Sequence, residues 1–317
     1  MKISFLAFAM ACASLASAQT RTPPRTPDGH PDLQGFWTNA TITPLERPRD
    51  LGAKEFFTEE EAAANRKRAL VPASVADRGG TEAHYEFTQF GLDRTQAQVA
   101  FSLRTSMIVG PDGRVPPLTP EAQQRIAERA AKAKGHEFDG PENRTIQERC
   151  IVWGNEGPPM LPPGYNSYLQ IVQAPGYVAI LQEMIHDARI IPLDGRPHVP
   201  QTIHGWLGDS RGRWEGDTLV VDTIDIDGDT WLDGIGTPHS DELHVVERLR
   251  RVAQDTLEIE FRFEDPKAYT KPWGGKKVFK LTPDLEYLPG LICDDRFKSD
   301  FEKKSLRDKK DWIEFKK

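Results

Sequence analysis

The sequence has few cysteines and lacks the short motifs that mark several large enzyme classes. Its 317 residues include three cysteines. It contains no Gly-rich phosphate loop, no C-x-x-C pair and no H-E-x-x-H. P-loop enzymes, thiol redox proteins and zinc metalloproteases therefore lose their usual sequence support.

The chain also lacks an excess of positive charge, and it lacks a long apolar run beyond its first 18 residues. No later stretch is long enough to span a membrane as a helix. The formal net charge is −7, from 41 Lys and Arg against 48 Asp and Glu. This balance argues against nucleic acid or an anionic membrane as a partner. We expect a small-molecule ligand or substrate and no membrane insertion, and the sequence leaves the oligomeric state open.

The N-terminus has the pattern of a secretory signal peptide over residues 1–18. A short basic start precedes an apolar run and the small-residue site Ala16-Ser17-Ala18. We expect cleavage after Ala18 and a soluble, periplasmic or secreted protein. Cys12 suggests a lipoprotein instead, but the Leu that usually stands three residues before such a cysteine is absent.

The two remaining cysteines, Cys150 and Cys293, are expected to form a disulfide, because an oxidising compartment favours pairing. Chain-entropy models give such a long loop about 5 kcal/mol of stabilisation. A reactive thiol is the alternative, but neither cysteine has a base beside it in the sequence.

The rest of the chain reads as one β-rich domain. We expect a proline-rich leader over residues 19–32, the domain over residues 33–295 and a polar tail over residues 296–317. A helical insertion is predicted at about residues 57–134.

Two helices are predicted within the insertion. The first covers residues 57–69, where Thr58 and Glu61 have the spacing of a capping box. The second covers residues 119–134, because Thr119 is a favourable N-cap and proline follows it.

Short apolar segments separated by turn residues predict mostly sequential antiparallel strands. The expected strands are residues 33–38, 103–109 with a return at 114–115, 168–173, 177–185, 188–193, 203–208, 217–226, 243–252, 256–264 and 277–281. The predicted fold class is therefore mainly β, an antiparallel lipocalin-like barrel or a strongly curved meander, with two helices in its N-terminal segment.

Strand alternation places one carboxylate on an apolar face. Along residues 243–252, Glu247 shares a face with Leu243, Val245 and Leu249. Burial raises the pKa of a carboxyl group unless a cation pairs with it. Glu247 is therefore either an ion-pair partner of Arg248 or Arg189, or an acid–base group in a pocket.

Histidines are concentrated between His186 and His244, a stretch that holds five of the eight. His186, His204 and His239 are candidate catalytic residues with Glu247, because a histidine exchanges protons near neutral pH. His198 and His204 are separated by five residues across Pro200, which suits a loop better than a helix, and we expect no metal and no other cofactor.

Aromatic residues supply candidate ligand contacts in the same half of the chain. The candidate substrate-binding residues are Trp206, Trp231, Tyr269, Trp273 and Arg189. The aromatic ones line an apolar cavity or, alternatively, fill the barrel core. Arg189 is also expected to pair with Asp187, because the two share a face of their strand.

Several strings resemble a family of exported bacterial proteins common in soil and aquatic bacteria. They are P-D-L-Q-G-F-W at 31–37, P-D-G-R-V-P-P-L-T-P-E at 111–121, I-P-L-D-G-R-P-H at 191–198 and G-D-S-R-G-R-W-E-G-D-T-L-V-V-D-T at 208–223. The resemblance covers nearly all of the mature chain, and it implies export without implying a particular reaction. Gly35-Phe36-Trp37 also resembles the G-x-W of the first strand in lipocalin-like barrels, from which the leader and the helical insertion depart.

Together these features favour an exported barrel enzyme that performs cofactor-independent acid–base chemistry on a small apolar or sugar-like molecule. A lyase, an isomerase or a hydrolase fits this description. The first alternative is a non-catalytic protein that binds a hydrophobic ligand. The second is a metal-dependent enzyme that uses the histidines.

Overall fold

The computed structural model describes residues 23–69, 100, 102–136, 139–140, 143, 146, 149, 151–152, 157–161, 167–183, 187–200, 202–232 and 236–283. Within them the strands are β1 (Gly35–Thr38), β2 (Tyr168–Ala174), β3 (Tyr177–Gln182), β4 (Ala188–Pro192), β5 (Asp209–Glu215), β6 (Thr218–Ile224), β7 (His244–Ala253), β8 (Thr256–Glu264) and β9 (Trp273–Leu281). The α-helices are α1 (Glu59–Ala69) and α3 (Pro120–Ala133), and Arg49–Leu51 form a short 3-10 helix.

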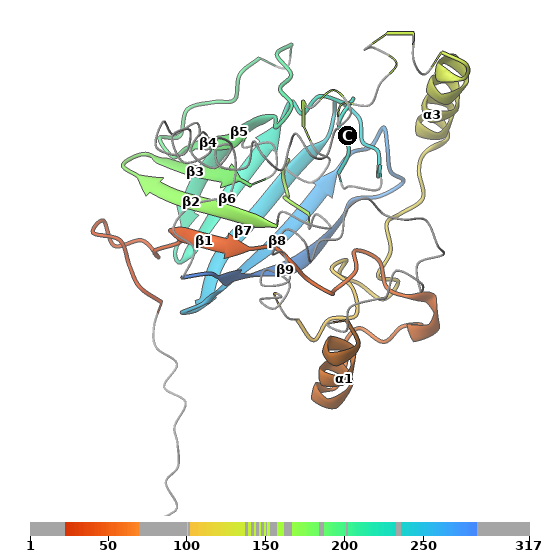
Figure 1. The fold of residues 1–317 in the computed structure, drawn as a ribbon. Coiled ribbons are helices and arrows are strands. Elements are labelled where there is room, and N and C mark those ends of the chain that lie inside the picture. Colours follow the sequence, from red (N-terminus) through yellow and green to blue (C-terminus); the bar gives the residue numbers. More distant parts are fainter. Residues whose placement is uncertain are drawn as a thin grey trace, which may run out of the picture.

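The nine strands form one antiparallel sheet that curls into a nearly closed barrel. Their order is β4-β3-β2-β1-β9-β8-β7-β6-β5. Only β1 and β9 are neighbours without being consecutive in the sequence, so the connectivity is that of an up-and-down barrel. Figure 1 shows β1 to β4 in front of β6 to β8, with both α-helices outside the barrel. The predicted mainly β barrel is confirmed.

The barrel has a seam between β4 and β5, the two ends of the sheet, where no hydrogen-bonded ladder joins these described strands. Side chains close the seam instead. A Cβ at Gly212 of β5 would lie 2.8 Å from Ile191 of β4 and 2.5 Å from Leu193. The glycine therefore lets apolar side chains beside β4 cover the backbone of β5.

Alternating residues of each strand fill the interior. On β8, Leu257, Ile259, Phe261 and Phe263 are buried, as the alternation predicts. The inward residues pack into two apolar clusters, one around Trp37 and the other around Tyr269 and Trp273. The inside of the barrel is therefore largely a side-chain core.

The helix starts follow the predicted capping chemistry. The Thr58 amide donates to the Glu61 carboxylate at 2.8 Å, and the Glu61 amide donates to the Thr58 hydroxyl at 3.2 Å, which is a capping box. Thr119 caps α3 by accepting from the Ala122 amide at 3.1 Å. The Thr119 amide also donates to the Ala268 carbonyl at 2.9 Å, which fixes the start of α3 beside the β8–β9 connection.

The predicted strand over residues 103–109, with its return at 114–115, is wrong. This segment forms isolated bridges from Arg104 to Phe56 and from Ile108 to Gly275. The Arg104 and Ser106 side chains bond to backbone carbonyls of the segment itself, so local bonds replace a ladder.

The predicted strand over residues 203–208 is also wrong, because the strand lies at 209–215. Its inward residues are Ser210, Gly212 and Trp214, so the apolar signal of a buried face is weak. Gly208 has a φ of +69°, which ends the preceding loop where β5 begins. Similarly, β9 begins four residues before the predicted 277–281. The sequence did not indicate this start, because Gly274 and Gly275 are residues with low strand propensity.

Candidate functional site

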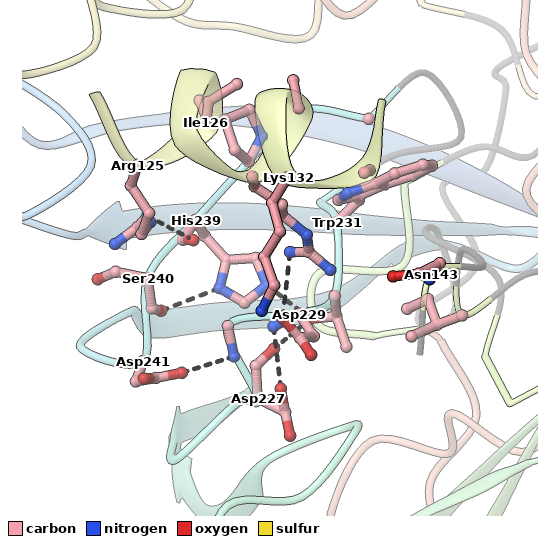
Figure 2. Close-up of a pocket in the computed structure, with 18 of the residues that line it drawn as sticks. Arg125, Ile126, Lys132, Asn143, Asp227, Asp229, Trp231, His239, Ser240 and Asp241 are labelled. Atoms are coloured by element: carbon pink, nitrogen blue, oxygen red, sulfur yellow. Dashed lines mark hydrogen bonds and ion pairs between the residues drawn. The ribbon is translucent and has the colours of Figure 1, made fainter. Parts of the chain in front are cut away.

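A wide groove separates α3 from the loop after β6, and we call it the α3 groove. It encloses about 1390 Å³. One wall is α3, the other is the loop that connects β6 to β7, and His204 also contributes to its lining. Figure 2 shows α3 crossing above the loop, with Arg125 and Lys132 extending from the helix toward it.

Two stripes of α3 face the groove. Both stripes have the spacing i, i+4, i+7, which places their members along one side of a helix. The charged stripe is Arg125, Arg129 and Lys132, and the apolar stripe is Ile126, Ala130 and Ala133.

His239 anchors the opposite wall. Its Nδ1 lies 3.0 Å from the Ser240 carbonyl, which can only accept, so Nδ1 carries a proton. Nε2 lies 2.6 Å from the Thr230 hydroxyl. Burial lowers the pKa of His239, which favours the neutral ring with Nε2 as an acceptor. Both ring nitrogens are therefore engaged, and the side chain is suited to holding the loop in place.

Charges connect the two walls. The Arg125 guanidinium donates to the His239 carbonyl at 3.1 Å. Arg129 and Asp229 form an ion pair at 3.1 Å, with side chains 59% and 57% exposed. The loop also folds on itself, because the Gly228 amide donates to the Asp241 carboxylate at 2.7 Å. The walls are linked near Arg125 and Arg129, and Lys132 contributes a further positive charge to the lining.

A small cavity lies behind the loop wall. Its volume of about 10 Å³ is close to the space that one water molecule requires. Trp206, Trp231, Thr230 and His239 are among its lining residues. The last three also line the α3 groove, so this part of the wall separates the two spaces.

The structure brings four of the predicted site residues together. His204, Trp231 and His239 line the groove, and Trp206 lies behind it. The Tyr269 hydroxyl donates to the Pro238 carbonyl at 2.6 Å, which links the same loop to the core.

Trp273 lies deeper and packs as a core residue. Its ring centroid is 4.5 Å from that of Phe263 and 5.5 Å from that of Tyr269. Tyr269 and Trp273 belong to one apolar cluster, so both pack in the barrel core. This is the alternative to lining an apolar cavity that the sequence left open.

Glu247 and Arg189 lie elsewhere, in the barrel interior. Arg189 Nη2 donates to Glu247 Oε2 at 2.6 Å, and the two side chains are 1% and 0% exposed. The Ser210 and Thr223 hydroxyls lie 3.3 and 3.4 Å from the same nitrogen. The Arg189 side chain therefore extends from β4 across the seam to β7. Glu247 forms an ion pair with Arg189, which is the first of the two alternatives that the sequence left open.

The predicted ion pair between Asp187 and Arg189 is wrong. Asp187 precedes β4, and its carboxylate accepts from the Ala188 amide at 2.7 Å. Arg189 points into the barrel, where Glu247 takes the role of its counterion.

Lys277 of β9 completes what we call the interior charge cluster, which consists of Arg189, Glu247 and Lys277. The Lys277 ammonium donates to the carbonyls of Pro159 and Met160, which lie in a loop against the barrel. Burial lowers the pKa of Lys277 to about 7, and Glu247 partly opposes this effect.

His198 and His244 form a separate network on the outer face of the barrel. His198 contacts Asp209 at 2.8 Å and Asp222 at 2.9 Å, and His244 contacts Asp222 at 2.9 Å. The bond to Asp222 raises the pKa of His244. Nowhere in the described part of the chain do three or more His, Cys, Asp or Glu side chains group so that they could hold a metal ion.

Three predicted site residues lie outside the described residues: His186, Cys150 and Cys293. The predicted signal peptide over residues 1–18 and the tail over residues 296–317 lie there as well. Among the residues that are described, no helix is both long and apolar enough to cross a membrane.

Sequence reasoning missed the stripes of α3 and Lys277. The stripes follow from the helical spacing of residues 125–133, read on a helix that was predicted. Lys277 alternates with Trp273, Gly275 and Phe279 on one face of β9, so extending that strand to its true start would have placed it inside.

Comparisons with known proteins add no relative to this description. No family model matches the chain, and neither a curated protein nor a solved structure matches it. What the chain has in common with lipocalin-like barrels is the coarse architecture of a nearly closed antiparallel barrel.

Proposed function

We propose that this is an exported protein that binds a small amphipathic anion in the α3 groove. The observation that carries the proposal is the pair of stripes on α3. The basic stripe faces the carboxylates of Asp227, Asp229 and Asp241, and an anionic group would take the place of Asp229 beside Arg129. The adjacent apolar stripe faces a wall that includes Trp231. A volume of about 1390 Å³ leaves room for a ligand with an apolar body.

Paired fluorescent probes test the proposal. Anilinonaphthalene sulfonate has an aromatic body and one negative charge, whereas phenylnaphthylamine has a similar body without the charge. We expect the sulfonate to bind more tightly. Lys132→Gln should weaken its binding about fivefold, since an exposed charge pair contributes up to about 1 kcal/mol.

Two further variants complete the binding experiment. Lys134→Gln removes a charge just beyond α3 and should leave both probes unaffected, whereas Ile126→Ser should weaken both. Equal binding of the two probes, together with no effect of Lys132→Gln, would contradict the proposal. Export is tested separately by mass spectrometry of the expressed protein, which should begin at Gln19.

Acid–base catalysis is the second candidate function, because exposed His204 lies on the groove. A bound ligand recovered chemically changed from the native protein, and unchanged from His204→Ala, would support catalysis. Recovery of unchanged ligand from the native protein would leave binding as the function. The metal-dependent alternative has no ligand set among the described residues.

A further inference from the structure

The outward residues of β2, β3 and β4 form an apolar face, which we call the outer β2–β4 face. The strand register arranges them in three rows, which are Gln170, Leu181 and Ala188; Val172, Ala179 and Ile190; and Ala174, Tyr177 and Pro192. None of these residues is charged. Val172, Tyr177 and Ile190 are 43%, 39% and 55% exposed, so this face includes large apolar side chains that meet water.

The outward residues of β7, β8 and β9 are largely charged instead. Across these strands Arg250 pairs with Glu258, and Lys276 pairs with Glu260. An antiparallel sheet with one face in water normally alternates apolar and polar residues, whereas strands that are apolar on both faces are typical of a sheet that is covered on both sides. The strands β2 to β4 are largely apolar on both faces, so we expect their outer face to be covered.

The size of the outer β2–β4 face indicates what kind of partner can cover it. Three strands about 4.8 Å apart, each contributing five residues at about 3.3 Å, give a flat area of about 240 Å². Each partner in a stable protein complex buries about 800 Å². The face is therefore too small to hold a free protein stably. A segment tethered to the same chain loses far less freedom on binding, so a small area is enough for it.

The chain leaves the barrel next to this face. Leu281, the last residue of β9, pairs with Trp37 of β1, and the Thr282 amide donates to the Phe36 carbonyl at 2.8 Å. Phe36 in turn pairs with Gln170, which begins the first row of the face. The chain therefore leaves beside β1, whose other neighbour in the sheet is β2.

The segment that follows has the composition and the reach to cover the face. Residues 285–292, which lie outside the described residues, have the sequence L-E-Y-L-P-G-L-I. Residues 294–317 are dense in Lys, Asp and Glu, so the segment 285–292 is the most apolar part of the chain after β9. Four strand spacings of about 4.8 Å separate β9 from β4, or about 19 Å, whereas the eleven residues from 282 to 292 span about 36 Å when extended.

We propose that residues 285–292 dock on the outer β2–β4 face and cover Val172 and Ile190. Docking removes apolar side chains of both the segment and the face from water, and the hydrophobic effect therefore favours it. This surface is separate from the α3 groove, whose lining includes none of the described residues of β2, β3 and β4.

Carbene footprinting of the full chain, read by mass spectrometry, tests the proposal. Val172 and Val252 are matched probes, because both are strand valines and they are 43% and 42% exposed. We expect Val172 to be labelled about fivefold less than Val252, since docked leucine side chains exclude the reagent from it. Leu288→Asp should raise the labelling of Val172 to that of Val252, because a charged side chain opposes burial.

Leu306→Asp is the matched control, because it makes the same change beyond the segment and should retain the native labelling ratio. Ile190→Asp alters the exposed face instead, so it should release Val172 in the same way even if Leu288→Asp does not fold. Equal labelling of Val172 and Val252 in the native protein would overturn the proposal. Protection of Val172 that survives Leu288→Asp would overturn it too. Protection that is lost on dilution would mean that a second copy covers the face, which also contradicts the proposal.

Discussion

The α3 groove and the barrel interior each bring cations close to carboxylates, but water reaches only one of them. Arg129 and Asp229 in the groove have side chains 59% and 57% exposed, whereas those of Arg189 and Glu247 are 1% and 0% exposed. Solvent and salt screen the first pair, so its attraction is weak and a ligand can replace either partner. The second pair is held in a low-dielectric core, where losing one partner is costly.

The difference separates two uses of charge within one chain. In the groove, exposed charges are available to the proposed ligand at little cost to folding. In the interior, charges hold together a barrel that has no ladder between β4 and β5. Mutations that affect stability and mutations that affect ligand binding should therefore fall into separate groups.

The largest expected effect is the loss of one member of the buried pair. Glu247→Leu should lower the free energy of unfolding by about 3–5 kcal/mol, because Arg189 would remain charged and unpaired in the core. The double variant Arg189→Leu/Glu247→Leu should recover much of this loss. Urea unfolding measures both. A single variant that costs less than the double one would show that the pair does not stabilise the barrel in this way.

Lys277 should make stability depend on pH. Its pKa is about 7 in the folded protein, against an ordinary value of 10.5, so between these pH values the unfolded chain binds more protons. Stability from this group therefore rises with pH across that window, by at most about 1.4 kcal/mol per pH unit, and is lost as pH falls through 7.

Lys277→Met should abolish that slope, and Lys276→Met is the matched control. Lys276 is the outward neighbour on β9, where it pairs with Glu260 at 3.0 Å and remains 37% exposed. Urea unfolding between pH 7 and pH 9.5 compares the three proteins. If Lys277→Met retains the native slope, the burial assigned to this lysine is wrong.

The smallest effect is expected in the groove. Arg129→Ala should change the free energy of unfolding by about 0–1 kcal/mol, since both members of its ion pair are exposed. High salt should reduce even this difference. A loss of unfolding free energy above about 2 kcal/mol would mean that the position of α3 depends on this ion pair. The exposed and the buried ion pair would then differ less in their contribution to stability.

The fold was largely predictable, because its strands alternate and its helix starts have the capping residues that they need. The misplaced starts of β5 and β9 have a common cause. Strand β5 has Ser210 and Gly212 on its inward face, and β9 begins Trp273-Gly274-Gly275, so neither shows a strong apolar period. In β5, close packing at the seam requires the small residue that weakens the pattern.

The candidate site was less predictable, because its walls are distant in the sequence. His204, His239 and Trp231 were identified from their chemistry, and they do line one groove. The opposite wall comes from α3, and only the fold brings it there. Glu247 shows the reverse case: alternation placed it on a buried face, and tertiary structure alone selects Arg189 over Arg248 as its partner.

The pairing of β1 with β9 determines when the barrel can be completed. Trp37 and Thr38 of β1 pair with Leu281 and Lys280 of β9, so β1 cannot complete its pairing until β9 has been synthesised. A chain synthesised from its N-terminus can form the β2–β3 and β3–β4 hairpins early, because those contacts are local. Closure of the ring needs nearly the whole domain, and until then one edge of β1 is unpaired and open to association with other chains.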